Sequence, residues 1–449
     1  MPHLTVVILT AGESTRMKSK VNKVLHPLAG RPMIEYVVSV GERLSAEKPV
    51  LVVSHNAEQV QALVGDRALY VCQSELLGTG HAVQQTEGLL RDRTETVLVL
   101  YGDNPLISEE TLRAMVDQHW RTEAAVTILT FRPSDPAQYG RIVRGRDGQV
   151  QAIVEWKEAS PEIRTIQEVN SGILCFQADF LWPSLAKVQP KHGEYYLTDL
   201  VEIAVEEGLH VGSQVANEEE VIGVDDRVKL ARAEAILRRR INERWMRAGV
   251  TIVDPSVTYI DADVEIGQDT VLYPNTYLQG ATCIGPDCQI GPNTLICDST
   301  LGAHCEVRLS VVEGAVLEDE VDAGPFSHLR PGAYFSRGVH VGNFCEVKNS
   351  RLGPDTKIGH FSYLGDAEVG AEVNIGAGTV TCNYNGVRKH RTIIEDGAFI
   401  GSDVMLVAPV RIGQGARIGA GAVVTRDIPP DCLAYGVPAR VKRKGSEET

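Results

Sequence analysis

The sequence has no apolar run of about 18 residues, the length at which a stretch becomes a candidate membrane-spanning helix. A secretory signal has a basic segment ahead of a hydrophobic core. The first residues, MPHLTVVILTAGES, carry no such basic segment. From these two absences we expect a cytoplasmic protein without stable membrane insertion.

Basic residues are in the minority, since 44 Lys and Arg stand against 59 Asp and Glu and leave a formal net charge of -15. Proteins that bind nucleic acid place many basic side chains against phosphates, so we expect no nucleic-acid partner. The nine cysteines form no C-x-x-C pair and no zinc-binding spacing, and we expect reduced thiols rather than a disulfide framework.

A chain of 449 residues exceeds the size of a single hydrophobic core, so two or more domains are expected. The first half alternates β-branched runs with amphipathic stretches, as in LTVVIL, PMIEYVVSVGERL, PVLVVS and ETVLVLYGD. This alternation predicts an α/β domain with a mostly parallel, Rossmann-like sheet. Ligands of such sheets bind at the carboxyl ends of the strands, so the loops after Leu9 and Leu100 are the places to search for a site.

The second half follows a six-residue period instead. Aliphatic residues recur six apart at Ile260, Ile266, Leu272, Leu278, Ile284, Ile290 and Ile296, and the period returns at Leu352 and again from Ile400 to Val424. This period fits neither a helix nor a simple strand, but it is typical of a parallel β-helix in which three short strands complete one turn of a prism. We expect the interruptions near 303–330 and 381–399 to be loops that leave the prism.

One helical stripe connects the two halves. It contains Leu230, Ala233, Leu237, Ile241 and Trp245, and its opposite face is strongly basic. We predict three segments: a nucleotidyltransferase domain at 1–226, a linker helix at 227–247 and a β-helix domain at 248–449.

The first strand is followed by a run of small residues and two basic ones. The segment is Leu9-Thr10-Ala11-Gly12-Glu13-Ser14-Thr15-Arg16-Met17, and Lys23 comes shortly after it. Small residues let backbone N–H groups approach a phosphate chain, and the basic side chains supply the charge that a triphosphate requires. The run resembles the signature of the sugar nucleotidyltransferases, with Thr10 in place of Ala, Ser14 in place of Gly and Asn22 in place of Pro.

Further segments match that family in order. They are Gln73 with Gly78-Thr79, then Tyr101-Gly102-Asp103, Gly140 in YGRI, Glu155 in IVE, Asn170 in EVNSGI and Asp225 in GVD. The resemblance implies that Gln73, Gly78 and Thr79 contact the uracil ring of UTP. It also implies that Gly140, Glu155 and Asn170 hold the sugar.

Transfer of a nucleotidyl group needs a hard cation to bridge the phosphates, and Asp103 at a strand end is well placed to bind Mg²⁺. The family's second metal ligand is typically an Asn in G-V-N, whereas this chain has Asp225. We predict that a sugar 1-phosphate oxygen attacks the α-phosphate of UTP and that pyrophosphate leaves. Positioning and charge neutralisation suffice for this step, without a general base.

The β-helix half contains a second group of polar residues at outward positions, in the segments VGNFCEVK, IGHFSYLGD and VNIGAG. With this group, nearly the whole chain resembles the bifunctional N-acetylglucosamine-1-phosphate uridylyltransferase and glucosamine-1-phosphate N-acetyltransferase family. The resemblance implies a left-handed β-helix, synthesis of UDP-N-acetylglucosamine for the cell wall, and a homotrimer whose acetyl site forms where neighbours meet.

The resemblance also implies the roles of individual residues. His360 is the expected general base, since an amine that attacks the thioester of acetyl-CoA must lose a proton. Glucosamine 1-phosphate is expected to contact Arg330, Lys348, Tyr363 and Asn374. Acetyl-CoA is expected to contact Ala377, Asn383, Tyr384, Ser402 and Ala420, together with Arg440 in a tail that departs from some relatives.

A rival hypothesis is a single-activity sugar-1-phosphate nucleotidyltransferase whose β-helix is structural or regulatory. Such a protein would not need His360, Asn374 or the Asn383-Tyr384 loop. A purely structural scaffold is a weaker alternative, because it would need neither the phosphate loop nor Asp103.

Overall fold

The computed structural model describes residues 3–12, 15–55, 57–136 and 139–442 of the chain. It separates into two compact units, Met1–Leu237 and Arg238–Thr449, and the division falls inside helix α9 (Arg227–Arg247). None of the helices in the described part of the chain combines the length and the apolar character that a membrane span requires.

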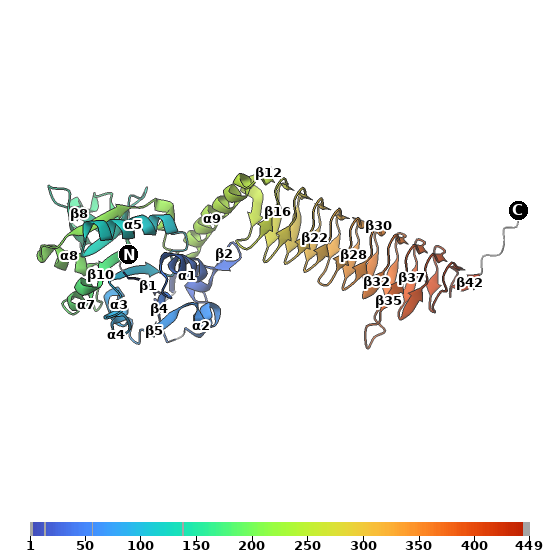
Figure 1. Cartoon of the computed structure of the whole chain (residues 1–449), viewed down its shortest axis with the longest axis horizontal. Helices are drawn as coiled ribbons and strands as arrows, with labels where there is room; N and C mark the ends of the chain where they lie inside the picture. Colours follow the sequence, from blue (N-terminus) through green and yellow to red (C-terminus); the bar gives the residue numbers. More distant parts are fainter. Residues whose placement is uncertain (1–2, 13–14, 56, 137–138, 443–449) are drawn as a thin grey trace. The chain divides into compact units, whose positions relative to one another are not determined.

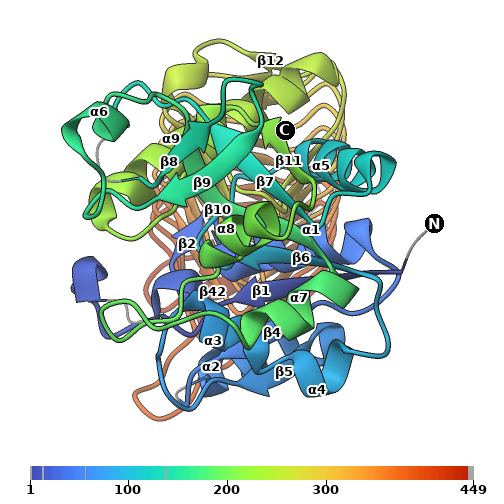
Figure 2. The same ribbon diagram turned by 90° about the vertical axis from the view of Figure 1, so that its left-hand side faces the viewer.

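The first unit is built on a twisted sheet (Figure 2). Its main strands, in spatial order, are β11 (Val211–Val215), β7 (Val126–Phe131), β10 (Val169–Gln177), β6 (Thr96–Tyr101), β1 (Leu4–Leu9), β4 (Val50–Val53) and β5 (Leu69–Cys72). Neighbouring strands are parallel except that β10 runs antiparallel to both β6 and β7. The sheet is therefore mostly parallel, as the sequence predicts.

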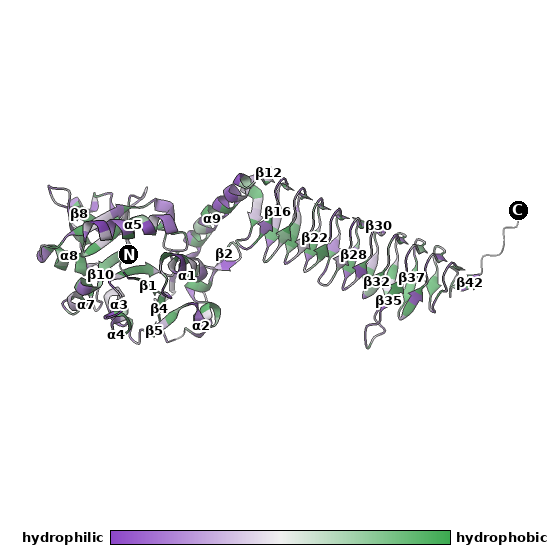
Figure 3. Cartoon of the chain, viewed as in Figure 1, coloured by the Kyte–Doolittle hydropathy of each residue, from purple (hydrophilic) through white to green (hydrophobic). Residues whose placement is uncertain are grey.

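Helices cover both faces of this sheet because its buried strands are apolar on both sides. Val6 and Ile8 of β1 point into one core with α1 (Met33–Leu44), α2 (Glu58–Val64) and α5 (Glu109–Thr122). Val7 and Leu9 point into the other core, with α3 (Thr79–Gln84), α4 (Glu87–Leu90), α7 (Ala178–Leu185) and α8 (Asp199–Glu206). Figure 3 shows the same pattern, with hydrophobic strands inside and hydrophilic helix surfaces outside.

A hairpin extends this sheet at one corner. It consists of β8 (Arg141–Arg144) and β9 (Val150–Val154), and β8 pairs with β10 at Val169. The short helix α6 (Pro161–Arg164) follows it.

The second unit is a left-handed parallel β-helix, whose coils follow one another in Figure 1. Its described strands form three sheets, which run from β12 (Thr251–Ile252) to β42 (Arg440–Lys442), from β13 (Thr258–Ile260) to β40 (Val423–Val424), and from β14 (Glu265–Ile266) to β38 (Val410–Ile412). The predicted inward residues Ile260 through Ile296 are all buried. Each coil stacks its aliphatic side chains on those of the next, as Ile290 does on Val307.

The expectation of a loop at 303–330 is wrong. The prism continues through this segment, with Val307, Val312, Leu317, Ala323 and Leu329 all buried. The steps from Val307 to Leu317 are five residues long, so the coils change phase without leaving the prism. By contrast, a loop does leave the prism between β34 (Val380–Cys382) and β35 (Thr392–Ile394). Figure 1 shows this loop projecting below the coils.

Candidate functional sites

The predicted phosphate loop and the predicted metal ligand lie at one edge of the central sheet. Strands β1 and β6 are parallel neighbours, with Leu9 opposite Tyr101, so the loops that follow them emerge together. Thr10, which replaces the usual Ala, is buried and donates its hydroxyl to the Val52 carbonyl at 2.8 Å. A Cβ at position 102 would come within 2.8 Å of the Thr10 methyl group, so the close approach of these two loops requires the glycine at position 102. Ser14 lies outside the described residues.

Two ion pairs join this edge to basic side chains. Lys23 Nζ lies 2.5 Å from Asp103 Oδ2, and an Arg16 guanidinium nitrogen lies 2.6 Å from Asp225 Oδ2. The backbone N–H of Val224 donates to the Asp103 carbonyl at 2.8 Å, which brings Asp225 next to Asp103. The structure therefore gathers the predicted metal ligands and the predicted phosphate-binding cations in one place.

The predicted uracil contacts form a second part of the same site. Gln73 is buried and donates its side-chain amide to the Gly78 carbonyl at 3.1 Å. Gly78 has a φ of 98°, and a Cβ there would lie 2.7 Å from the Tyr195 carbonyl oxygen, so only glycine fits this turn. The Thr79 hydroxyl accepts a hydrogen bond from the Leu197 N–H. It also bonds to the hydroxyl of Tyr101, whose pKa is raised strongly by burial and further by Asp103.

The predicted sugar contacts come together around β10. The Asn170 N–H donates to the Gly140 carbonyl at 2.9 Å, and a Cβ on Gly140 would lie 3.2 Å from a Glu155 carboxylate oxygen. Burial raises the pKa of Glu155, and the nearby carboxylates of Glu158 and Asp199 raise it further. Gly140 thus lies close to both Asn170 and Glu155, and Gly172, on the same strand as Asn170, lies against the Tyr101 ring.

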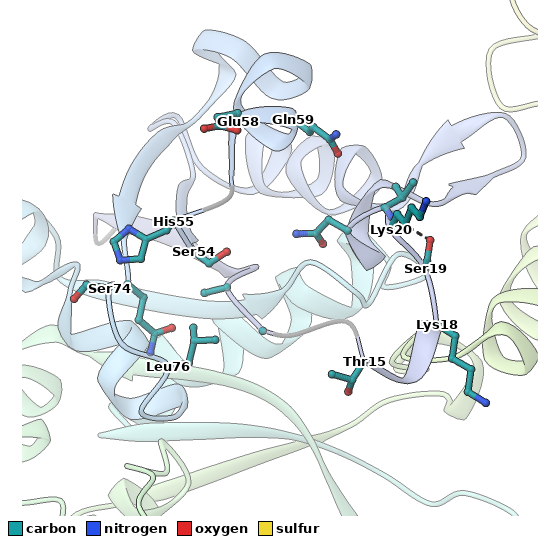
Figure 4. A pocket seen from close by; sticks show the side chains of 15 residues that line it. Thr15, Lys18, Ser19, Lys20, Ser54, His55, Glu58, Gln59, Ser74 and Leu76 are labelled. Carbon is teal, nitrogen blue, oxygen red and sulfur yellow. Dashed lines mark hydrogen bonds between the residues drawn. The ribbon is translucent and has the colours of Figure 1, made fainter.

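Two adjoining pockets cover this edge of the sheet. One, of 580 Å³, is lined by Leu9, Lys23, Tyr101 and Asp103 as well as by the uracil-contact residues. The other, of 890 Å³, contains Lys18, Lys20 and His55, and Figure 4 shows these side chains around it. Both share Ala11, Gly12, Gln73 and Leu76, so together they form a continuous space large enough for a nucleotide and a sugar.

In the β-helix, His360 lies in a straight column of residues along one edge of the prism. The coils stack in register, with Asn343 on His360, Lys357 on Asn374 and Phe399 on Arg417. The same register brings one residue of each successive coil to the position of His360. These residues are Asn343, His360, Ala377, Ser402 and Ala420. The predicted base and three predicted acetyl-CoA contacts are therefore neighbours. Arg440, opposite Tyr435, lies beside Gly436 at the end of this column.

Three of the four predicted glucosamine 1-phosphate residues lie on or next to the strands of the adjacent sheet. Arg330 and Lys348 follow Leu329 and Val347, which pair between β25 (His328–Leu329) and β28 (Glu346–Lys348). An Arg330 guanidinium nitrogen lies 2.6 Å from Glu346 Oε1, and Tyr363 of β31 (Tyr363–Gly365) pairs with Glu346 on the next coil. Asn374, in β33 (Asn374–Ile375), lies on the sheet that carries His360, one coil further on.

The loop that leaves the prism adds to this second group. Asn383 is buried and donates its side-chain amide to Asp366 Oδ2 at 2.6 Å, beside the Tyr363 hydroxyl. Tyr384 is exposed and donates to the Gly386 carbonyl. The two predicted acetyl-CoA residues of this loop thus differ. Asn383 packs against residues predicted to bind the sugar phosphate, whereas Tyr384 is exposed to solvent.

Comparisons with known proteins agree with both halves. The MobA-like NTP transferase domain matches residues 6–193, and the bacterial transferase hexapeptide (six repeats) matches residues 391–426. The chain is 47% identical to the bifunctional protein GlmU of Shouchella clausii, over 97% of each chain. It is 48% identical to that of a Geobacillus strain, over 98% of this chain and 96% of the relative, and 45% identical to that of Halalkalibacterium halodurans, over 100% and 98%. The chain belongs to the GlmU family.

This GlmU membership confirms the family and the fold that the motifs predict, and it makes the chain a bifunctional transferase. The roles assigned to single residues stay predictions. They are supported by the geometry described above and are tested by the variants proposed below.

The residues beside Asp103 suit Mg²⁺. In the described chain no group of three or more His, Cys, Asp or Glu is arranged to bind a metal, but Mg²⁺ commonly takes one or two carboxylates and completes its shell with phosphates and water. Asp225 Oδ1 is buried and accepts no hydrogen bond from any described residue. The Lys229 ammonium nitrogen nevertheless lies 2.9 Å from it, so a cation that contacts both Asp103 and this oxygen would share it with Lys229.

Sequence reasoning missed three polar residues that the GlmU fold brings to the β-helix site. Glu346 bonds Arg330, and Asp366 bonds Asn383. Lys389, from the loop, lies close enough to Lys348 to lower the pKa of that ammonium group, with Arg330 as a further cause. Three cations near one point indicate an anion site. The cluster K-H-R at 389–391 was the available signal, but nothing in the sequence shows where the loop folds back.

Proposed function

We propose that the chain makes UDP-N-acetylglucosamine in two steps. The β-helix unit transfers an acetyl group from acetyl-CoA to glucosamine 1-phosphate. The N-terminal unit then transfers a uridylyl group from UTP to N-acetylglucosamine 1-phosphate and releases pyrophosphate. The observation that supports this proposal is that each unit brings together predicted residues from separate segments: Asp103 and the Asp225 segment in the first, and His360 with Ala377 in the second.

In the nucleotidyl site, Asp103 and Asp225 would hold Mg²⁺, which would offset charge on the phosphates of UTP. Arg16 and Lys23 turn from these carboxylates to the triphosphate, so the positive charge is already beside the reacting group. The attacking oxygen belongs to the sugar phosphate, which is largely ionised near neutral pH and needs no base. A new P–O bond forms at the α-phosphate as the bond to pyrophosphate breaks.

In the acetyl site, His360 takes the proton that the amine of glucosamine 1-phosphate loses as it attacks the thioester carbonyl. The cations Arg330, Lys348 and Lys389 hold the sugar phosphate. The column beyond His360 consists of the small residues Ala377, Ser402 and Ala420, which leave room for the coenzyme along the prism edge. Collapse of the tetrahedral intermediate releases the thiol of coenzyme A and leaves the amide product.

The purified chain tests this proposal directly. With glucosamine 1-phosphate, acetyl-CoA, UTP and Mg²⁺, we expect one equivalent each of coenzyme A thiol and pyrophosphate per UDP-N-acetylglucosamine. Leaving out acetyl-CoA removes the thiol, and supplying N-acetylglucosamine 1-phosphate restores pyrophosphate release. Pyrophosphate release without any acetyl-CoA-dependent thiol would instead support the single-activity hypothesis.

We also expect a homotrimer. Phe326, Phe344 and Phe361 occupy one corner of successive coils, beside His360, and are 55%, 62% and 57% exposed. The first two stack with their ring centroids 5.2 Å apart. Such an apolar ladder is costly in water, and homo-oligomers usually close by rotational symmetry. Light scattering at micromolar concentration should give three times the chain mass of 48.9 kDa. A monomer with full acetyltransferase activity would refute this expectation.

A further inference from the structure

Asp225 gives the nucleotidyl site one more negative charge than the usual pattern. The resembling family typically has an Asn here, which is neutral, beside the carboxylate that corresponds to Asp103. Two carboxylates side by side repel each other and bind a divalent cation more tightly than one carboxylate and one amide. The structure must therefore be searched for a residue that offsets the added charge.

Lys229 is that residue. It lies on the first turn of α9, and Asp225 lies two residues before that helix begins. Its Nζ lies 2.9 Å from Asp225 Oδ1 and 3.0 Å from Oδ2, and it donates a hydrogen bond to the latter. One Lys, Asp225 and Asp103 together carry the same net charge as one Asn and one Asp.

The surroundings hold Lys229 more firmly than the other cation at Asp225. The Asp226 side chain accepts the Lys229 N–H at 2.8 Å, which fixes the backbone where the helix begins. The Lys229 side chain is 38% exposed, whereas that of Arg16 is 69% exposed and belongs to the phosphate loop. Arg16 is thus free to turn to a nucleotide, while Lys229 stays with Asp225.

We propose that Lys229 is a positioning residue that offsets the charge of Asp225 and sets the affinity of the site for its divalent cation. The ammonium group and the cation share the two oxygens of Asp225, so Lys229 weakens cation binding to a level that permits exchange. This inference rests on the proposed nucleotidyl site, because Asp103 and Asp225 must both face the cation.

The test uses the full-length chain and Mn²⁺ alone, with free Mn²⁺ measured by electron paramagnetic resonance. We expect Lys229→Gln to tighten Mn²⁺ binding about fivefold, because a screened charge beside the cation is removed. Lys229→Arg keeps the charge and should stay within about twofold of the unchanged chain. In the Asp225→Asn background, where the two groups no longer pair, Lys229→Gln should change the affinity less than about twofold.

The matched control is Lys187→Gln, which removes a lysine from a surface ion pair with Glu207 in the same unit; neither residue lines the two pockets of the site. It should leave Mn²⁺ affinity unchanged. The inference would be overturned if Lys229→Gln changed Mn²⁺ affinity equally in the unchanged chain and in the Asp225→Asn background. It would also be overturned if Lys229→Gln weakened Mn²⁺ binding or left it unchanged. Asp103→Ala distinguishes a failure of this inference from a failure of the proposed metal site. If it weakens Mn²⁺ binding while Lys229→Gln does nothing, only this inference fails; if it changes nothing, the metal site and the inference both fail.

Discussion

Replacing Asp103 with alanine is expected to lower uridylyl transfer about a thousandfold and to leave acetyl transfer within about twofold. The metal ion contributes several kcal/mol to the stabilisation of the transferring phosphate, and each 1.36 kcal/mol corresponds to about a tenfold change in rate. Asp103 follows β6, a central strand of the sheet, and lies beside Lys23 and the Asp225 segment. Acetyl transfer is spared because its residues lie in the other compact unit.

Pyrophosphate release and thiol release, measured on the same preparation, check this prediction. Asp103→Asn keeps the shape of the side chain and should lose nearly as much activity, since it is the charge that binds the cation. Asp117→Ala is the matched control, because that carboxylate is exposed on α5 and makes no contact with the site. Equal loss of both activities in Asp103→Ala would contradict the separation of the two sites.

Much of the β-helix could be predicted because its physics is local and repeated. Each short strand turns one aliphatic side chain inward, so one such residue recurs every six positions. Ile260 through Ile296 are buried as this period requires. The period becomes unreadable where turns shorten to five residues, between Val307 and Leu317. At Ala323 a small residue fills the inward position, 3% exposed, and gives no hydrophobic signal. These two features explain why 303–330 was expected to be a loop.

The nucleotidyl site was predictable only in part. The rule that parallel strands end at one edge was enough to bring the Leu9 loop next to Asp103. It could not show that Val224 would bond the Asp103 carbonyl, because this contact depends on how the chain returns to the sheet after β11. Nor could it show the antiparallel β10, whose irregular register between Asn170 and Leu174 brings Asn170 and Gly172 to the patch beside Tyr101.

The acetyl site, like the nucleotidyl site, was predictable only in part. His360 and Ala377 share a coil position at a spacing of 17 residues, and it was the family resemblance that assigned both to one site. Lys389 comes from the loop between β34 and β35, where the period stops and no local rule fixes the path of the chain. Long-range packing of that loop, through the Asn383–Asp366 hydrogen bond, decides the geometry of the anion site.

Replacing His360 with alanine is expected to lower acetyl transfer about a hundredfold to ten-thousandfold, the range that general acid–base catalysis contributes, and to spare uridylyl transfer. The side chain is exposed on the edge of the prism, so its loss removes a reacting group and no core packing. The neighbouring inward residue Ile358 keeps the coil in place. The amine would then have to lose its proton to water, which is a much weaker base.

His360→Asn and His304→Asn form a matched pair that separates this role from a change in surface charge. Both histidines lie on the outside of the β-helix, but the His304 ring is 4.0 Å from Asp287, on a different part of the prism from the His360 column. Thiol release across pH 6–9 should collapse for the first variant and stay unchanged for the second. Because a base acts in the chemical step, the loss should appear in kcat with little change in KM for glucosamine 1-phosphate. Wild-type acetylation by His360→Asn at every pH would show that another group takes the proton.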